Sequence, residues 1–362
     1  MVARFGGEGK SVVALQEVME DGRLKCVLCP RECALRDGQR GMCFVRQRVG
    51  DEIVLDTYGR STGFCIDPIE KKPLNHFLPG TPVLSFGTAG CNLACKFCQN
   101  HETSKSREVD AASATATPEM IARAAVNGGC ASVAFTYNDP VIFYEYALDT
   151  AAACRSVGVK TVAVTAGYIH DAPRRVFFDA MDAANIDLKG FSEAFYRSLT
   201  GASLAPVLET IQYAVRETAC WVELTVLLIP GQNDSDAELE ALTHWVVEAC
   251  GPDVPVHFSA FHPDFRMMDT PATPVETLLR AHEIGLRAGL HHVYVGNVHH
   301  KAAQSTYCPG CGIMVIGRDW YALSDWGLDD FGECTTCGTR LAGVFDGPPG
   351  TWGRQRRPVR LV

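Results

Sequence analysis

The segment Ser85-Phe86-Gly87-Thr88-Ala89-Gly90-Cys91-Asn92-Leu93-Ala94-Cys95-Lys96-Phe97-Cys98-Gln99-Asn100 decides the fold class of this chain. The short apolar run 83–87, which is typical of a β-strand, leads directly into it. Its cysteines, Cys91, Cys95 and Cys98, follow a C-x3-C-x2-C spacing. Structural zinc sites and electron-transfer clusters generally use four protein ligands, whereas three thiolates on a cubane leave one iron open to another ligand. The spacing predicts a [4Fe–4S] cluster with an open iron, and the alternative is a three-cysteine zinc site completed by a distant histidine.

A repeated pattern of short apolar run, turn and helix-period segment extends from about residue 82 to residue 297. The predicted strands are 83–87, 132–137, 161–165, 184–188, 223–229, 256–260 and 292–295. Two of the helices have recognisable starts, with Thr117 or Thr273 as N-cap and the proline that follows at the first helical position. Such alternation is typical of parallel strands joined by right-handed crossovers. We therefore predict an α/β fold, either a doubly wound sheet or a partial or full (β/α) barrel.

Composition narrows the class of protein. The 362 residues are 47% hydrophobic and 21% charged, which is typical of a soluble globular chain. The net charge of -9 argues against a uniformly basic surface that coats nucleic acid. The first thirty residues resemble no secretory signal, and no apolar run reaches the roughly 18–20 residues of a membrane span. Sixteen cysteines without such a signal indicate reduced, metal-binding thiolates, so we expect a cytoplasmic protein with no membrane segment.

Two further cysteine groups flank the predicted core. The C-terminal group forms two knuckles separated by 22 residues, which predicts a structural zinc ribbon at Cys308, Cys311, Cys334 and Cys337. The N-terminal group supplies four thiolates for zinc or an auxiliary cluster, with zinc favoured, at Cys26, Cys29, Cys33 and Cys43. The remaining cysteines are scattered and are expected to be small buried residues: Cys65, Cys130, Cys154, Cys220 and Cys250. We predict three parts: a Cys-rich module over 1–80, a core over 81–305, and a ribbon-like tail with an Arg-rich end over 306–362.

The cluster loop resembles that of the radical S-adenosylmethionine (SAM) superfamily, in which the methionine amine and carboxylate of SAM chelate the open iron. The resemblance implies that the enzyme cleaves SAM reductively to a 5′-deoxyadenosyl radical, which abstracts hydrogen from a substrate. It also implies a place beside the adenine for Phe97, whose alternative role is packing of the loop. The cofactor carries the difficult chemistry, and the protein must supply geometry and exclude solvent.

Later strand ends resemble the SAM-binding signatures of pyruvate formate-lyase activating enzymes. The implied SAM contacts are Asn138, Asp139, Thr165, Asp187, Lys189 and His262. Asp139 stands where those enzymes receive the SAM amino group, and its alternative role is a helix N-cap. Asp187 is placed near the ribose and Lys189 near the methionine carboxylate, with an ordinary ion pair as the alternative. Residues two apart on a strand share a face, so this pair is expected to project into the barrel together.

Almost the whole chain resembles the radical SAM enzyme of the AmmeMemoRadiSam system, a relative of glycyl-radical-enzyme activases. The segments that carry the likeness are 26–46, 67–77, Cys98-Gln99-Asn100, Gly296-Asn297-Val298 and the terminal ribbon. The resemblance implies an AMMECR-domain protein and a Memo-family protein as partners. We also expect a reductant such as flavodoxin or ferredoxin, and a macromolecular substrate. Glycyl radical formation and modification of RNA or protein both remain open, and the alternative class is a non-catalytic zinc-ribbon adaptor.

Overall fold

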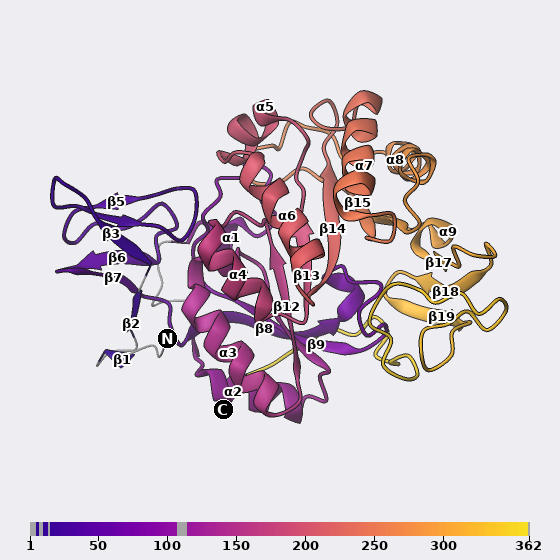
Figure 1. Ribbon diagram of the computed structural model, residues 1–362, viewed down its shortest axis with the longest axis horizontal. Helices are drawn as coiled ribbons and strands as arrows, with labels where there is room; N and C mark the ends of the chain where they lie inside the picture. Colours follow the sequence, from indigo (N-terminus) through magenta and orange to yellow (C-terminus); the bar gives the residue numbers. More distant parts are fainter. Residues whose placement is uncertain (1–4, 7–9, 14, 107–113, 361–362) are drawn as a thin grey trace.

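The computed structural model describes residues 5–6, 10–13, 15–106 and 114–360, and a parallel sheet forms its centre (Figure 1). Seven parallel strands follow one another in the described sheet: β9 (Pro82–Gly87), β11 (Ser132–Phe135), β12 (Lys160–Thr165), β13 (Ala183–Asp187), β14 (Trp221–Leu228), β15 (Val256–Ala260) and β16 (Val293–Gly296). All seven predicted strands are confirmed, with bounds that differ by at most two residues. Nearly all their residues are buried on both faces, as expected for a parallel sheet covered by helices.

Helices connect these strands and cover the sheet (Figure 1). The longer ones are α2 (Pro118–Asn127), α3 (Tyr144–Ser156), α4 (Asp171–Asp179), α6 (Ala205–Glu217), α7 (Asp236–Cys250) and α8 (Val275–Arg287). The short ones are η1 (Ile69–Lys71), α1 (His101–Ser104), η2 (Pro140–Phe143), α5 (Glu193–Phe195), the π-helical turn η3 (Tyr196–Thr200) and α9 (Lys301–Gln304). Every helix in the described segments is too short or too polar to serve as a transmembrane span.

The two predicted helix starts have different outcomes. Thr117 caps α2 as expected, because its hydroxyl accepts a hydrogen bond from the backbone N–H of Met120. The prediction for Thr273 was wrong, since α8 begins one residue later and has Pro274 at its N-cap position. The Thr273 hydroxyl instead donates to the carbonyl oxygen of Leu228 at 2.6 Å, which ties this loop to the end of β14.

The sheet is open at its edges. Strand β8 (Arg60–Pro68) pairs antiparallel with β9, and both β10 (Ala114–Thr115) and β20 (Arg357–Pro358) pair with β8. Among the described residues β16 has no partner on its outer side, so a closed barrel is excluded there and the partial form of the prediction holds. The boundary predicted at residue 80 falls between the paired strands β8 and β9, and the chain's C-terminal part returns to the same edge.

Two small β-modules stand at opposite ends of the molecule (Figure 1). The N-terminal one contains β1 (Phe5–Gly6), β2 (Lys10–Val13), β3 (Gln16–Val18), β4 (Leu24–Cys26), β5 (Ala34–Leu35), β6 (Arg46–Val49) and β7 (Glu52–Leu55). The C-terminal one is a three-stranded antiparallel sheet of β17 (Thr306–Tyr307), β18 (Met314–Asp319) and β19 (Ala322–Trp326). The second module has its own small apolar core around Val315, Ile316 and Leu328.

Candidate active site

A pocket of about 340 Å³ opens where the parallel strands end. The cluster loop lines part of it, together with the segment that follows β11 and residues from each of the strands β12 to β16. Arg318, Trp320 and Tyr321, from the C-terminal module, line it as well. Ligand sites in open α/β sheets lie outside the carboxyl ends of the strands, and this pocket has the volume of a small-molecule site.

The cluster loop is anchored from several directions. The amide of Asn138 donates to the Thr88 hydroxyl and to the Gly90 carbonyl oxygen, both at 3.0 Å, and its oxygen accepts from the Thr88 N–H. Gly90 has φ +85°, and a side chain there would collide with the carbonyl oxygen of Cys43. The Lys105 ammonium donates to the Leu93 carbonyl oxygen at 2.6 Å. These contacts fix the backbone that presents the three thiols.

The three thiols of this loop line the pocket together. Burial raises the pKa of Cys91, and it raises the pKa of Cys95 to about 12, so both need nearby positive charge to ionise. In the described residues, these three sulfurs do not form a set within 4.8 Å of one another, whereas the four C-terminal cysteines do. A single zinc ion would hold its thiolates about 3.8 Å apart, while a cubane separates them more widely. The loop therefore fits a cluster better than a single ion.

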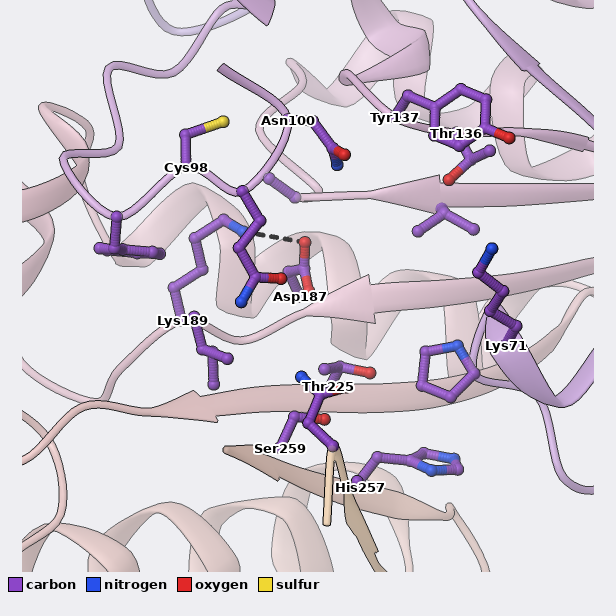
Figure 2. Close-up of a pocket in the computed structure, with 18 of the residues that line it drawn as sticks. Lys71, Cys98, Asn100, Thr136, Tyr137, Asp187, Lys189, Thr225, His257 and Ser259 are labelled. Atoms are coloured by element: carbon purple, nitrogen blue, oxygen red, sulfur yellow. Dashed lines mark hydrogen bonds and ion pairs between the residues drawn. The ribbon is translucent and has the colours of Figure 1, made fainter. Parts of the chain in front are cut away.

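Asp187 and Lys189 lie in the pocket and face each other, as strand geometry predicted (Figure 2). The Lys189 Nζ is 2.8 Å from Asp187 Oδ2. The same ammonium lies 6.0 Å from the ring centroid of Phe97, which is buried in the pocket wall. Burial lowers the pKa of Lys189, but the charges of Asp187 and Cys95 outweigh it and raise the pKa. The lysine is thus a fixed cation beside the cluster loop.

Asp139, in the pocket wall, and Thr165, behind it, form a hydrogen-bonded pair. The Asp139 carboxylate accepts from the Thr165 hydroxyl at 2.9 Å, and from the backbone N–H groups of Val141 and Ala166 at 3.0 Å. Burial raises the pKa of Asp139, while these hydrogen bonds oppose the shift. Asp139 caps η2, which was the alternative role, although it still lines the pocket. Thr165 is buried and is not among the pocket-lining residues.

His262 lies outside the pocket, contrary to its predicted place. Strand β15 ends at Ala260, Phe261 fills the buried position that follows, and the His262 side chain is exposed. On the same strand, His257 and Ser259 line the pocket (Figure 2). The two-residue periodicity of β15 is the signal that could have identified them.

A polar network below the pocket was not predicted from the sequence. Glu223 accepts from the His257 ring at 2.6 Å and from the backbone N–H of His76 at 2.7 Å. Arg318 of β18 donates to Thr306 and to the carbonyl oxygen of Asn75, at 2.6 and 2.7 Å. Arg318 is buried and also lines the pocket. Its hydrogen bond to Asn75 attaches the C-terminal module to the core.

Replacement of Asn138 by alanine is expected to weaken the anchoring of the cluster loop. The substitution removes three hydrogen bonds and leaves the Thr88 and Gly90 groups unpaired in a buried site, which costs about 2–4 kcal/mol of unfolding free energy. Denaturant unfolding of the variant and its iron content after reconstitution would show the effect. Asn127→Ala, at the exposed end of α2, is the matched control and should change neither quantity. Unchanged stability of Asn138→Ala would show that the loop is held by other contacts.

Burial of Glu70 in η1 makes the free energy of unfolding depend on pH. Burial raises its pKa to about 7, against the opposing charge of Arg318, and its Oε2 has no hydrogen-bond partner. The folded state therefore prefers the protonated acid. The free energy of unfolding decreases as pH rises from 4.5, the ordinary pKa of the group, to its folded-state pKa of about 7. Glu70→Gln mimics the protonated form, so its unfolding free energy should exceed that of the wild type by up to about 3 kcal/mol at pH 8. The difference should be small near pH 5.

Denaturant titrations at the two pH values measure this difference. Exposed Glu276 in α8 offers the control, Glu276→Gln, for which the two curves should coincide. A Glu70→Gln variant less stable than the wild type at pH 8 would show that the ionised carboxylate is needed by its neighbours.

The chain is similar to one protein family, to a relative of nearly the same extent and to several solved structures. Residues 86–242 match the family described as the Radical SAM superfamily. The uncharacterized protein MJ0808 of Methanocaldococcus jannaschii is 38% identical over 326 residues, which cover 90% of this chain and 97% of that protein. A domain of a pyruvate-formate lyase-activating enzyme from Bacteroides vulgatus is 14% identical, with a TM-score of 0.41 over 46% of this chain and 99% of that chain. A radical SAM methyltransferase from Sphaerobacter thermophilus is 16% identical, with a TM-score of 0.48 over 79% and 76%.

A three-thiolate loop at the ends of parallel strands, beside a pocket with fixed charges, defines a cluster-binding α/β enzyme. This chain belongs to the radical SAM superfamily. Membership implies a [4Fe–4S] cluster and SAM as cofactors, and the four C-terminal cysteines could hold zinc.

Proposed function

We propose that this enzyme binds a [4Fe–4S] cluster through Cys91, Cys95 and Cys98 and binds SAM in the adjoining pocket. The observation that carries the proposal is that the three-thiol loop and the Asp187–Lys189 pair line one pocket. When bound, the reduced cluster and SAM supply a 5′-deoxyadenosyl radical, which abstracts hydrogen from a substrate. A zinc-ribbon adaptor would not need these residues around one cavity.

The chain's own residues would orient SAM and exclude water. Lys189 offers a fixed positive charge for the methionine carboxylate, and Asp187 offers acceptors for hydroxyl groups. Phe97 contributes an apolar ring to the same wall. Trp320 and Tyr321, from the C-terminal module, line the pocket and would limit the access of solvent to a reactive radical.

The small size of the pocket favours a macromolecular substrate, of which only a part would enter. Its volume of about 340 Å³ is near the lower end of the range for sites that hold one small molecule. SAM would fill most of this space, so the substrate would present only a side chain, a backbone segment or a nucleotide at the mouth. We propose an activase of a glycyl radical enzyme or a modifying enzyme of RNA or protein, with the Arg-rich C-terminal end as a docking element.

The partners follow from the sequence resemblance alone. We propose that an AMMECR-domain protein and a Memo-family protein act with this enzyme, that flavodoxin or ferredoxin supplies the electron, and that the system works in the reducing cytoplasm. Addition of each purified partner to the reconstituted enzyme should raise the rate of SAM cleavage or yield a modified product. Rates and products that stay unchanged with both partners present would contradict this part of the proposal.

The central test is SAM cleavage by the full chain. After anaerobic reconstitution with iron and sulfide, dithionite and SAM should yield 5′-deoxyadenosine and methionine in equal amounts. A chain with a loaded cluster and bound SAM that forms neither product, with or without the partners, would contradict the proposal. A chain that loads no cluster would favour the adaptor.

The proposed SAM contact of Asp187 has its own test. Asp187→Asn keeps the shape of the side chain but removes the charge that holds Lys189 at 2.8 Å, so the lysine loses its fixed position. We expect SAM affinity to fall about 10-fold, or about 1.4 kcal/mol. Equilibrium binding to the reconstituted protein measures this, and Asp182→Asn, on the loop before β13, is the control. Unchanged affinity would show that the pair is only structural.

A further inference from the structure

The four cysteines of the N-terminal module surround a second cavity, separate from the pocket already described. Cys26, Cys29, Cys33 and Cys43 all line an enclosed space of about 20 Å³. This volume exceeds the roughly 10–15 Å³ that admits one water molecule. The four thiols thus face a common void without collapsing onto one another.

The spacing of these thiols distinguishes between zinc and an iron–sulfur cluster, the two alternatives that the sequence left open. A tetrahedral zinc ion with Zn–S bonds of about 2.3 Å holds its thiolates about 3.8 Å apart. The C-terminal cysteines fit that value, with Sγ–Sγ distances of 3.5 Å for Cys308 and Cys337 and 3.8 Å for Cys311 and Cys334. In the described part of the chain, no three of the N-terminal thiols lie within 4.8 Å of one another. Among the described residues, the thiols of the cluster loop do not form such a set either.

The surroundings of the cavity suit a buried, negatively charged group. Leu28, Leu35 and Ile142 supply apolar walls. Arg46 also lines the cavity and is almost fully buried, and its guanidinium forms an ion pair with Glu145 at 2.7 Å. Arg31, at the same wall, donates to the carbonyl oxygens of Asn92 and Gly201, and the backbone N–H of Met42 donates to Cys33 Sγ at 3.4 Å. A cluster held by four thiolates is anionic, and N–H groups directed at its sulfurs stabilise it.

The cavity adjoins the cluster loop. Asn92, the residue after Cys91, forms part of the cavity wall, and its carbonyl oxygen accepts from Arg31 Nε at 2.7 Å. The backbone of Cys43 packs directly against Gly90 on the other side of the loop. The segments that carry the two groups of thiols are therefore in direct contact.

We propose that Cys26, Cys29, Cys33 and Cys43 bind a second iron–sulfur cluster, adjacent to the SAM-binding one, and that zinc occupies only the C-terminal module. From the sequence, zinc was favoured at the N-terminal module, and the proposed cluster replaces it there. With four protein ligands the second cluster has no open iron, so it does not bind SAM.

Metal analysis of the full chain tests the proposal. After anaerobic reconstitution and removal of unbound metal, the wild type should contain about eight iron atoms and about one zinc. The variant Cys91→Ser/Cys95→Ser/Cys98→Ser leaves the N-terminal module untouched and should keep about four iron atoms and the absorption and Mössbauer signature of a cubane. A variant with Cys311→Ser/Cys337→Ser should lose the zinc and keep both clusters.

Two further variants make the result decisive. Cys29→Ser/Cys33→Ser should lose about half of the iron and keep the zinc, whereas Cys130→Ser, at a buried thiol outside this cavity, should keep all of both metals. If the variant without the cluster-loop cysteines holds about two zinc ions and no iron, or no metal in the N-terminal module, the proposal is overturned. Because this variant cannot cleave SAM, its metal content is independent of the proposed function.

Discussion

Replacement of Cys91, Cys95 and Cys98 by alanine is expected to lower the rate of 5′-deoxyadenosine formation by more than about a thousand-fold, which corresponds to about 4 kcal/mol. The three thiols are the cluster-loop ligands that line the pocket, and in the described residues no other cysteine lines it. Without them, no iron remains next to Lys189 and Asp187 to take up the methionine end of SAM. The variant should fold, since Asn138 and Lys105 still hold the loop through Thr88, Gly90 and Leu93 when the weaker contacts of the thiols are lost.

The measurement is the yield of 5′-deoxyadenosine and methionine with dithionite, together with the circular dichroism spectrum as a check on folding. Cys130→Ala and Cys154→Ala serve as controls, because both thiols are buried away from the pocket and should leave the rate unchanged. A variant without the three thiols that cleaves SAM at the wild-type rate would place the reactive cluster elsewhere in the molecule.

The parts of the site that the sequence predicted share a simple cause. The cluster loop follows one strand, and Asp187 and Lys189 occupy alternate positions at the end of another. Strand periodicity and the common edge of a parallel sheet are enough to bring them together. His262 did not follow this rule, because the chain leaves β15 at Ala260 and Phe261 takes the buried position.

The rest of the site depends on contacts between distant parts of the chain. Arg318 donates to the carbonyl oxygen of Asn75, which is 243 positions away in the sequence. No local pattern marks Arg318, Trp320 or Tyr321 as pocket residues, since they belong to a module whose cysteines indicate only a metal ion. Asp139 illustrates a second limit, because one carboxylate at a strand end could serve either a ligand or a helix cap, and the structure shows its cap hydrogen bond.

Loss of the C-terminal metal site is expected to open the pocket. Cys311→Ser/Cys337→Ser removes one thiol from each knuckle of a four-cysteine group whose sulfurs lie within 4.8 Å of one another. Structural zinc sites contribute directly to folding free energy, so we expect the module to lose at least about 3 kcal/mol of local stability. Its small core around Val315 and Leu328 does not compensate in full, because few apolar side chains belong to it.

The consequence for the site follows from Arg318, which bonds to Thr306 and Asn75 from within this module. When the module loosens, Trp320 and Tyr321 no longer complete the pocket wall, and we expect solvent to reach Asp187 and Lys189. We expect faster proteolysis after residue 305, an unchanged iron content, and more 5′-deoxyadenosine formed per substrate turned over, because the radical is quenched before it reacts. Cys250→Ser in α7 is the control. Resistance to proteolysis equal to that of the wild type would show that packing of Arg318, rather than the metal, holds the module on the core.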